Sequence, residues 1–240
     1  MDLRFKVFMF IKQFKYSTDN LGYLVYSTSE GIAIDAGGVD DTLAFAEKNN
    51  IHIKYVSNTH SHYDHTPGNK ALLEKTAAQF IDCKKIKSDQ AIALDKEILT
   101  VFHTPGHTDD SITFVANDFL VTGDTLFNGT IGNCFSGDLK GFFQSLKRLA
   151  SLPENMKIYG GHDYVMESMK MAKIIEKDNP HIEAYINKYN SGLIVSTLED
   201  EFRVNPYIRF NSPGMINNLQ KRNMRTDTEY ARFKSIMDIY

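Results

Sequence analysis

The sequence predicts an α/β (α+β) protein whose C-terminal region is helical. Short apolar runs of strand length recur from the N-terminus to about residue 160, separated by Ser, Thr and Gly turns. Stretches with an amphipathic helical period lie between some of these runs. From about residue 165 onward, helix-like segments punctuated by prolines replace the strands. We therefore expect one domain over residues 1–165 and a helical region over residues 166–240.

Strands are expected where apolar or alternating residues form runs of three to seven. The first such run has apolar side chains at alternate positions, and the later ones are nearly continuous, as in buried strands. Further short strands are expected between residues 79 and 122. The main expected strands are Phe5–Ile11, Tyr23–Tyr26, Ile32–Asp35, Ile53–Ser57, Ile98–Phe102, Phe119–Thr122 and Lys157–Tyr159.

Four helices are expected from capping residues and apolar stripes. Asp40 or Asp41 can cap a short helix that ends near Lys48, and a proline in the first turn favours a helix over Pro67–Ala77. Asp138 can cap the clearest helix. Two apolar stripes with steps of three and four residues mark the last two helices: Leu139, Phe142, Phe143, Leu146, Leu149 and Leu152, and Val165, Met169, Ala172 and Ile175.

Composition disfavours several classes of protein. With 240 residues, 42% of them hydrophobic, the chain can bury a full core without structural metals or disulfides. A net charge of −3 gives no attraction to nucleic acid, and two cysteines make no disulfide framework. No run approaches the roughly 20 apolar residues of a membrane span, and no signal peptide is recognisable. We expect a cytoplasmic protein with no nucleic-acid or membrane partner, and its oligomeric state stays open.

The strongest motif is the run from Thr59 to His65, Thr-His-Ser-His-Tyr-Asp-His, directly after an apolar strand. His60, His62, Asp64 and His65 place four potential metal ligands within six residues. Side chains so close together can converge in a tight loop, and nitrogen and oxygen ligands suit zinc, iron or manganese. The motif therefore predicts a metal site, against the alternative of a polar surface loop.

Three later positions have the same pattern. His107, Asp124 and His162 each follow an apolar strand and stand beside a glycine, in Thr-Pro-Gly-His-Thr, Gly-Asp-Thr-Leu-Phe and Gly-Gly-His-Asp-Tyr. Glycine lets the backbone turn sharply at a strand end, where side chains face clefts. We expect all three at the same site. His52 and His181 lie outside every motif and are expected at the surface, and the role of His103 stays open between support of the site and packing.

Together, these motifs resemble the ordered motifs of the metallo-β-lactamase superfamily, and they are most similar to those of glyoxalase II, the hydroxyacylglutathione hydrolase group. The similarity covers residues from about 20 to 165, and Glu201–Arg209 resembles a further stretch of glyoxalase II-like proteins. The resemblance implies a four-layer αββα sandwich with two divalent metal ions, zinc ahead of iron or manganese, at one rim of the sheets. The implied ligands are His60, His62 and His107 for the first metal, Asp64, His65 and His162 for the second, and Asp124 between them.

The resemblance also implies a reaction. Two divalent ions can share a water and lower its pKa toward about 7, which supplies hydroxide for the hydrolysis of a small thioester or ester. Asp64 is the expected catalytic residue, which orients the hydroxide and accepts its proton. The expected substrate-binding residues are Asn133, Phe135 and Tyr164. Asn133 and Phe135 stand where glyoxalase II has a basic residue and a tyrosine, whereas Tyr164 matches the family.

Other activities remain open on the same residues. A persulfide dioxygenase would use one iron held by His60, His107 and Asp124. A lactonase or another ester hydrolase would use the two-metal site. A non-catalytic binding module would keep the fold but carry out no reaction. A β-lactamase is disfavoured because no cysteine falls among the second-metal ligands, and a flavodiiron protein because a carboxylate is expected where His62 stands.

Overall fold

The protein contains two mixed β-sheets in a computed structural model that describes residues 9–239. The alternation predicted at Phe5 and Val7 lies outside the described residues. The first sheet has the order β1-β2-β3-β4-β5, and the second has the order β11-β10-β9-β8-β7-β6. The strands of the first sheet are β1 (Phe10–Tyr16), β2 (Asn20–Tyr26), β3 (Glu30–Ile34), β4 (His52–Ser57) and β5 (Gln79–Ile81). Those of the second are β6 (Gln90–Leu94), β7 (Glu97–His103), β8 (Ile112–Val115), β9 (Phe119–Gly123), β10 (Lys157–Gly160) and β11 (Ser196–Thr197).

Eight α-helices complete the described part of the chain. They are α1 (Val39–Lys48), α2 (Asn69–Lys75), α3 (Leu139–Ala150), α4 (Val165–Ile175), α5 (His181–Lys188), α6 (Leu198–Val204), α7 (Pro213–Lys221) and α8 (Glu229–Met237), and a short 3₁₀ turn spans Cys83–Lys85. None of the described helices combines the length and apolar character needed to cross a bilayer.

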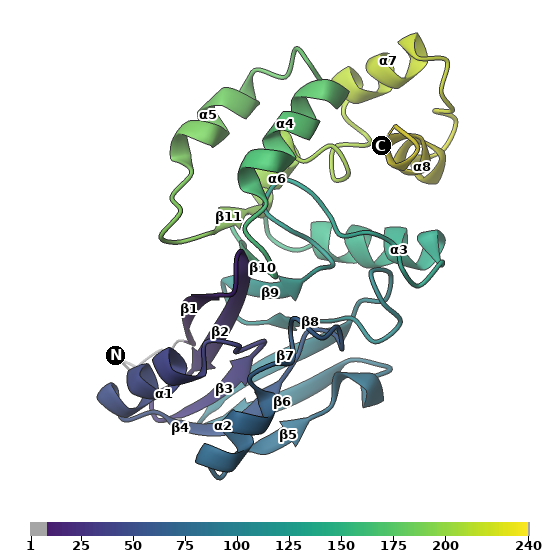
Figure 1. Cartoon of the computed structure of the whole chain (residues 1–240). Coiled ribbons are helices and arrows are strands. Elements are labelled where there is room, and N and C mark those ends of the chain that lie inside the picture. The colour runs from purple at the N-terminus through teal and green to yellow at the C-terminus, as the bar shows by residue number, and fades with distance from the viewer. Residues whose placement is uncertain (1–8, 240) are drawn as a thin grey trace, which may run out of the picture.

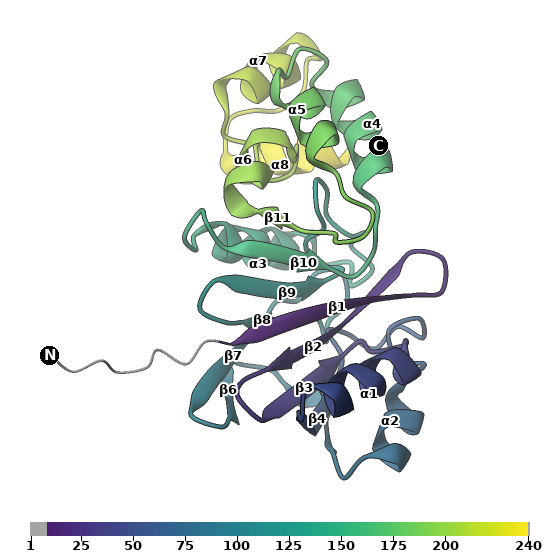
Figure 2. The same ribbon diagram turned by 90° about the vertical axis from the view of Figure 1, so that its left-hand side faces the viewer.

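The two sheets pack face to face and carry helices on their outer faces, which confirms the four-layer αββα sandwich. Neighbouring residues of one strand divide between the layers because strand side chains alternate. Tyr23 and Val121 belong to the core between the sheets. Leu24 packs instead in the cluster with α1 and α2, and Leu120 in the cluster with α3. In Figures 1 and 2, α1 and α2 lie beside β3 and β4, whereas α3 lies near β9 and β10.

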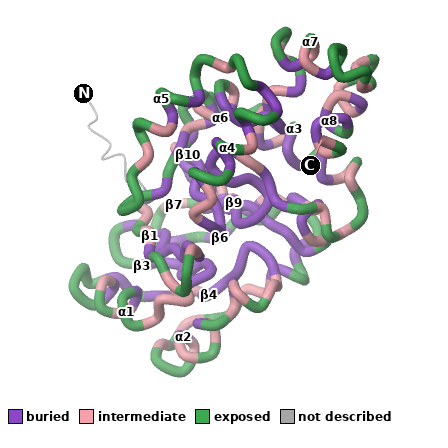
Figure 3. Tube along the Cα trace, turned by 45° about the horizontal axis from the view of Figure 1, so that its top comes forward, coloured by how far each residue is buried: buried purple, intermediate pink, exposed green. Residues whose placement is uncertain are grey.

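The helical C-terminal region lies beyond the β11 end of the second sheet (Figures 1 and 2). Phe233 of α8 packs against Phe143 of α3 with ring centroids 5.2 Å apart, so this region shares a core with the sandwich. Residues 196–197 also add a strand to the second sheet, which the sequence did not predict because two residues carry no periodicity. Figure 3 shows the buried trace running through the sheets and the exposed trace along the outer helices.

Two predicted helix starts were wrong. Helix α1 begins at Val39 with Gly38 as its N-cap, so Asp40 and Asp41 lie within the first turn. There the positive end of the helix dipole stabilises their carboxylates, but neither residue caps the helix. Helix α2 begins at Asn69, two residues after Pro67. The third prediction is confirmed, because the Asp138 carboxylate accepts a hydrogen bond from the Gly141 backbone N–H at 2.9 Å.

Candidate metal centre

The predicted ligands follow the carboxyl ends of four strands. His60 to His65 come after β4, His107 after β7, Asp124 after β9 and His162 after β10. Strand β9 pairs with β10 in parallel, so their carboxyl ends lie at one edge of the second sheet. A backbone hydrogen bond from Ile112 N–H to the Thr59 carbonyl, 2.8 Å long, joins this edge to the loop after β4. The topology therefore brings segments that are up to a hundred residues apart into one place.

Three histidines form the first group, with their ring nitrogens directed at one point. His62 Nδ1 lies 3.0 Å from His60 Nε2 and 3.1 Å from His107 Nε2. His60 is 1% exposed and His107 is 4% exposed, so the sandwich largely excludes water from this side. The arrangement offers three imidazole nitrogens to one cation.

Asp64, His65 and His162 form the second group. His65 Nε2 lies 3.2 Å from His162 Nε2, and Asp64 Oδ2 lies 3.6 Å from the former and 3.3 Å from the latter. These three ligand atoms can also converge on one cation. Because histidine and aspartate supply nitrogen and oxygen, both groups suit zinc, iron or manganese.

Asp124 lies between the two groups. Its Oδ1 is 3.3 Å from His65 Nε2, and its Oδ2 is 3.5 Å from His107 Nε2 and 3.6 Å from His162 Nε2. Among the described residues, Asp124 Oδ1 is buried and accepts no hydrogen bond. A buried carboxylate oxygen without a donor is costly, and a cation on that oxygen would remove the cost.

Glycines make this close approach possible. Gly123 has φ +50°, and a Cβ there would lie 2.2 Å from Thr59 Oγ1. A Cβ on Gly161 would lie 2.1 Å from Asp124 Oδ1. Any larger residue would therefore displace a side chain of the centre or its support.

Hydrogen-bond acceptors assign the tautomers of the buried histidines. Asp35, which is fully buried, accepts a bond from His65 Nδ1 at 3.1 Å and from the Thr59 hydroxyl at 2.6 Å. With its proton directed at Asp35, the Thr59 oxygen can accept from His60 Nδ1 at 3.2 Å. His65 and His60 thus carry hydrogen on Nδ1, which leaves each Nε2 free for a ligand bond.

The same pattern holds for the other two histidines. His107 Nδ1 donates to the Asn133 carbonyl at 2.9 Å, and His162 Nδ1 lies 3.1 Å from Asp19 Oδ1. The Nε2 atoms of His65 and His162 therefore face each other at 3.2 Å as two acceptors. Either a proton or a metal cation must lie between them, so the donor set fits a bound metal.

The pKa values of the histidines shift in two directions, downward through burial and upward beside carboxylates. Burial, followed by repulsion from His65, lowers the pKa of His60 to about 2. Burial also lowers the pKa of His107. For His65, the effect of burial is outweighed by the Asp35 and Asp124 carboxylates, which hold the pKa well above its usual value. Burial would raise the pKa of Asp124, but the imidazoles of His162 and His65 hold it well below its usual range. At neutral pH Asp124 is thus a carboxylate.

The predicted catalytic Asp64 is held from two sides. Its Oδ2 accepts a hydrogen bond from the Asn20 amide at 3.1 Å, and its backbone carbonyl accepts one from the Tyr16 hydroxyl at 2.8 Å. Asn20 is 4% exposed, whereas Asp64 is only half-buried. The carboxylate is therefore fixed in orientation while it remains open to the solvent side of the centre.

The three residues predicted to bind substrate surround this centre. Asn133 holds His107 through its carbonyl, and its side chain is exposed. Phe135 is 66% exposed, and its ring lies edge-on to His107 with centroids 5.2 Å apart. Tyr164 stacks in parallel on His162 at 4.9 Å. All three positions are open to a molecule approaching the metal ligands.

Sequence reasoning missed the residues that orient the ligands: Asp19, Asn20, Asp35 and Thr59. Asp35 had a usable signal, since it directly follows an apolar strand, as Asp124 does. His52 and His181 are exposed, as predicted. His103 donates a hydrogen bond from Nε2 to the Asp109 backbone carbonyl of its own loop at 3.0 Å.

Comparisons with known proteins give two family matches. The family model described as metallo-beta-lactamase superfamily matches residues 20–86 and 84–162, and the model described as hydroxyacylglutathione hydrolase C-terminus matches residues 163–238. The hydroxyacylglutathione hydrolase of Pelagibacter ubique is 34% identical over 212 residues, which cover 80% of this chain and 89% of that protein. The one of Chromohalobacter salexigens is 30% identical over 223 residues, covering 85% and 87%.

Solved structures agree on the fold. The crystal structure of ETHE1 from Myxococcus xanthus has a TM-score of 0.67 at 24% identity, and it covers 95% of this chain and 100% of that chain. A metallo-beta-lactamase from Staphylococcus aureus subsp. aureus COL has a TM-score of 0.66 at 21% identity, covering 95% of this chain and 71% of that chain. At these identities the likeness shows the architecture alone.

Proposed function

The chain belongs to the metallo-β-lactamase superfamily and, within it, to the hydroxyacylglutathione hydrolases, and from this premise we propose that it is a metal-dependent thioester hydrolase of the glyoxalase II type. The observation that carries the proposal is the pairing of two complete ligand groups across one buried carboxylate. A structural site would need only one closed set of four ligands, whereas a catalytic centre leaves room for substrate.

His60, His62 and His107 would hold one ion, Asp64, His65 and His162 would hold the second, and Asp124 would bridge them. We propose two divalent ions, most simply zinc, because each group combines neutral imidazoles with few carboxylates. When bound, such a pair supplies a water of lowered pKa and an electrophilic partner for a carbonyl oxygen.

Side chains of the protein would orient the substrate and accept a proton beside the two metals. Asp64, fixed by Asn20, can accept a proton on the open side of the centre. The exposed ring of Phe135 shields the outer side of His62 and His107, which favours an acyl group with apolar surface there. A thiolate leaving group, with a pKa of about 8.5, needs little help from a general acid, so a thioester suits this arrangement better than an alkyl ester.

Metal content and a thioester panel test the proposal. Purified protein should contain close to two divalent ions per chain and should hydrolyse acyl thioesters. His62→Ala should lose metal and activity together, whereas His103→Ala, which removes a nearby half-buried histidine outside both groups, should keep both.

A mononuclear-iron persulfide dioxygenase would leave Asp64, His65 and His162 without a role. One iron per chain, with oxygen consumed on a persulfide substrate and no thioester hydrolysis, would replace the hydrolase by that activity. A His62→Ala variant with full activity would remove the two-metal mechanism.

A further inference from the structure

A cavity of about 230 Å³ adjoins the metal centre on the side of the C-terminal helices. Two of its lining residues contact the ligands directly. The Asn133 carbonyl accepts from His107 of the first group, and the Tyr164 ring stacks on His162 of the second group. A molecule in this cavity therefore lies beside both metal positions.

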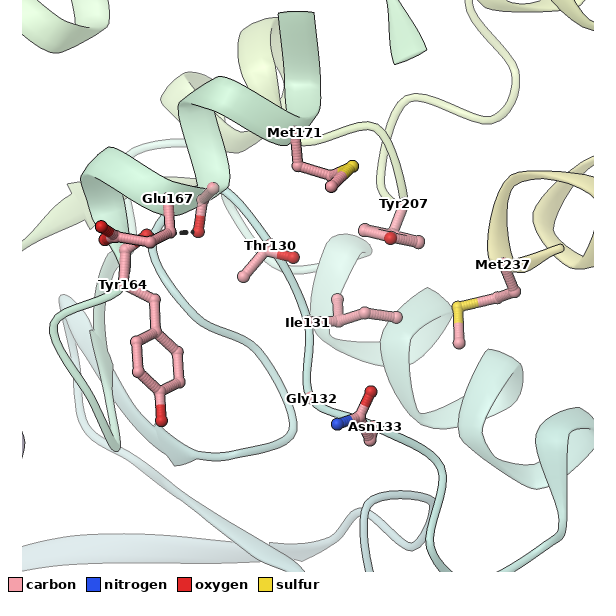
Figure 4. A pocket seen from close by; sticks show the side chains of 10 residues that line it. Thr130, Ile131, Gly132, Asn133, Tyr164, Glu167, Met171, Tyr207 and Met237 are labelled. Atoms are coloured by element: carbon pink, nitrogen blue, oxygen red, sulfur yellow. Dashed lines mark hydrogen bonds between the residues drawn. The ribbon is translucent and has the colours of Figure 1, made fainter. Parts of the chain in front are cut away.

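The walls of the cavity are largely apolar. Figure 4 shows Ile131, Met171, Tyr207 and Met237 on one side, with Tyr164 and Glu167 on the other. The apolar side chains come from the loop after β9, from α4, from the segment after α6 and from α8. The cavity thus exists only where the C-terminal region meets the sandwich.

Among the described residues, no lysine or arginine lines the cavity. The only carboxylate among the described lining residues is Glu167, whose side chain is 70% exposed and pairs with Lys170 at 3.8 Å. Such an exposed pair leaves little net charge for a ligand. The cations nearest in sequence to the lining residues are also paired: Lys173 with Glu183, Arg209 with Glu176 at 2.7 Å and Lys234 with Asp238 at 2.6 Å.

From these walls we infer that the thiol part of the preferred substrate carries no carboxylate, and that apolar or amide groups of that thiol occupy the cavity. This inference deepens the proposed function and rests on it, since the cavity is assigned to the thiol side of a thioester. A carboxylate placed against these walls loses water and finds no lysine or arginine side chain among the described lining residues in return, whereas an apolar group gains by burial.

The polar groups that line the cavity suit an uncharged ligand. The Asn133 amide and the Thr130 and Tyr164 hydroxyls can each exchange one hydrogen bond with an amide of the ligand. A charge-assisted contact to a carboxylate contributes about 1.5–3 kcal/mol, so its absence corresponds to about 10- to 100-fold in affinity. The relatives are named for glutathione, whose two carboxylates would lack that contact here.

Binding of non-hydrolysable thioethers tests the inference separately from catalysis. The two probes are S-methylglutathione and the same molecule with both carboxylates as methyl esters, measured by calorimetry on the metal-loaded protein. We expect the diester to bind at least tenfold more tightly. Equal binding, or tighter binding of S-methylglutathione with its two free carboxylates, overturns the inference.

A charge-introducing variant gives the reciprocal test. Met237→Lys places an amine at the cavity wall and should raise the affinity for S-methylglutathione about 10- to 100-fold. Ile174→Lys adds the same charge at an exposed position of α4 outside the cavity and should leave the affinity unchanged. A similar gain in both variants, or no gain in Met237→Lys with an unchanged unfolding midpoint, contradicts the assignment of the cavity.

The two proposals fail in different ways. If the metal-loaded protein hydrolyses neither a glutathione thioester nor the thioester of a neutral thiol such as N-acetylcysteamine, the proposed function fails. If it hydrolyses both but prefers the glutathione thioester, the function stands and the inference about the thiol is wrong.

Discussion

Replacement of Asp35 by asparagine tests whether one buried carboxylate organises the metal centre from behind. Asp35 accepts three hydrogen bonds: from the Thr59 backbone at 2.8 Å, from the Thr59 hydroxyl at 2.6 Å and from His65 Nδ1 at 3.1 Å. Its backbone has φ +49°, a conformation that asparagine also tolerates. The substitution therefore changes the chemistry of the side chain and leaves the backbone unstrained.

The structure sets the size of the effect. An asparagine can keep one oxygen toward the Thr59 backbone, but its NH₂ group then faces His65 Nδ1, which is also a donor. The loss of a charge-assisted bond and the burial of an unpaired donor cost about 3–5 kcal/mol of unfolding free energy. With its tautomer no longer fixed, His65 should bind metal about 10- to 100-fold more weakly.

Two measurements separate these effects. Urea unfolding of the metal-free protein gives the stability, and competition with a chromogenic chelator gives the metal affinity. Asp95→Asn is the matched control, because Asp95 has φ +51° and accepts three hydrogen bonds from Ser29 and Glu30 in a turn outside the metal centre. It should leave the metal affinity unchanged.

A normal metal affinity in Asp35→Asn would refute the reasoning that the acceptor behind His65 sets its tautomer. An equal loss of affinity in both variants would also refute it, since the effect would then follow from general destabilisation.

Three further outcomes follow from the structure. Burial raises the pKa of Glu201 to about 7, so the folded state binds this proton more tightly than the unfolded chain does. The unfolding free energy should therefore fall by about 3 kcal/mol as the pH rises from about 4.5 to beyond 7. Urea unfolding at pH 5 and pH 8 should show this decrease in the metal-loaded wild type but not in Glu201→Gln. Removal of the metals by a chelator should lower the thermal unfolding midpoint. If free metal was present at 1,000 times its dissociation constant, the loss of bound metal lowers the unfolding free energy by about 4 kcal/mol. An unchanged midpoint would count against a bound metal. Tyr164→Phe keeps the ring that stacks on His162 at 4.9 Å, so the metal content should stay constant. The KM for a thioester should rise about fivefold because one hydrogen bond to the substrate is lost. A loss of metal instead would show that the hydroxyl helps to hold the metals.

Much of the architecture could be predicted from the sequence because the signals are local. Apolar strands recur with turns between them, and Asp138 stands one residue before the stripe of α3. The two wrong helix starts show the limit of such signals. Gly38 and Gly68 cap α1 and α2 without any side-chain hydrogen bond, and only the packing of the chain decides where those helices begin.

The convergence of the predicted ligand residues could be expected for a similar reason. The predicted ligands lie in the segments that follow β4, β7, β9 and β10, and the parallel pairing of β9 with β10 brings two of those strand ends together. The acceptors behind the ligands could not be found in the same way. Asp19 lies in the turn before β2, yet it contacts His162, which is 143 positions away in the chain. No spacing rule links two such residues, because their contact exists only once both sheets have formed.

Glu201 extends this argument from the ligands to the C-terminal region. The fully buried carboxylate accepts hydrogen bonds from the Gly129 backbone at 2.9 Å and from the Asn205 amide at 2.8 Å, and Asn205 also donates to the Thr130 carbonyl at 3.1 Å. These bonds attach the loop after β9 to α6. The same loop supplies the Asn133 carbonyl that orients His107. Helix α6 is thus connected to the predicted ligand His107 through residues 129–133 of one loop, and the C-terminal region supports the candidate metal centre as well as forming a wall of the cavity beside it.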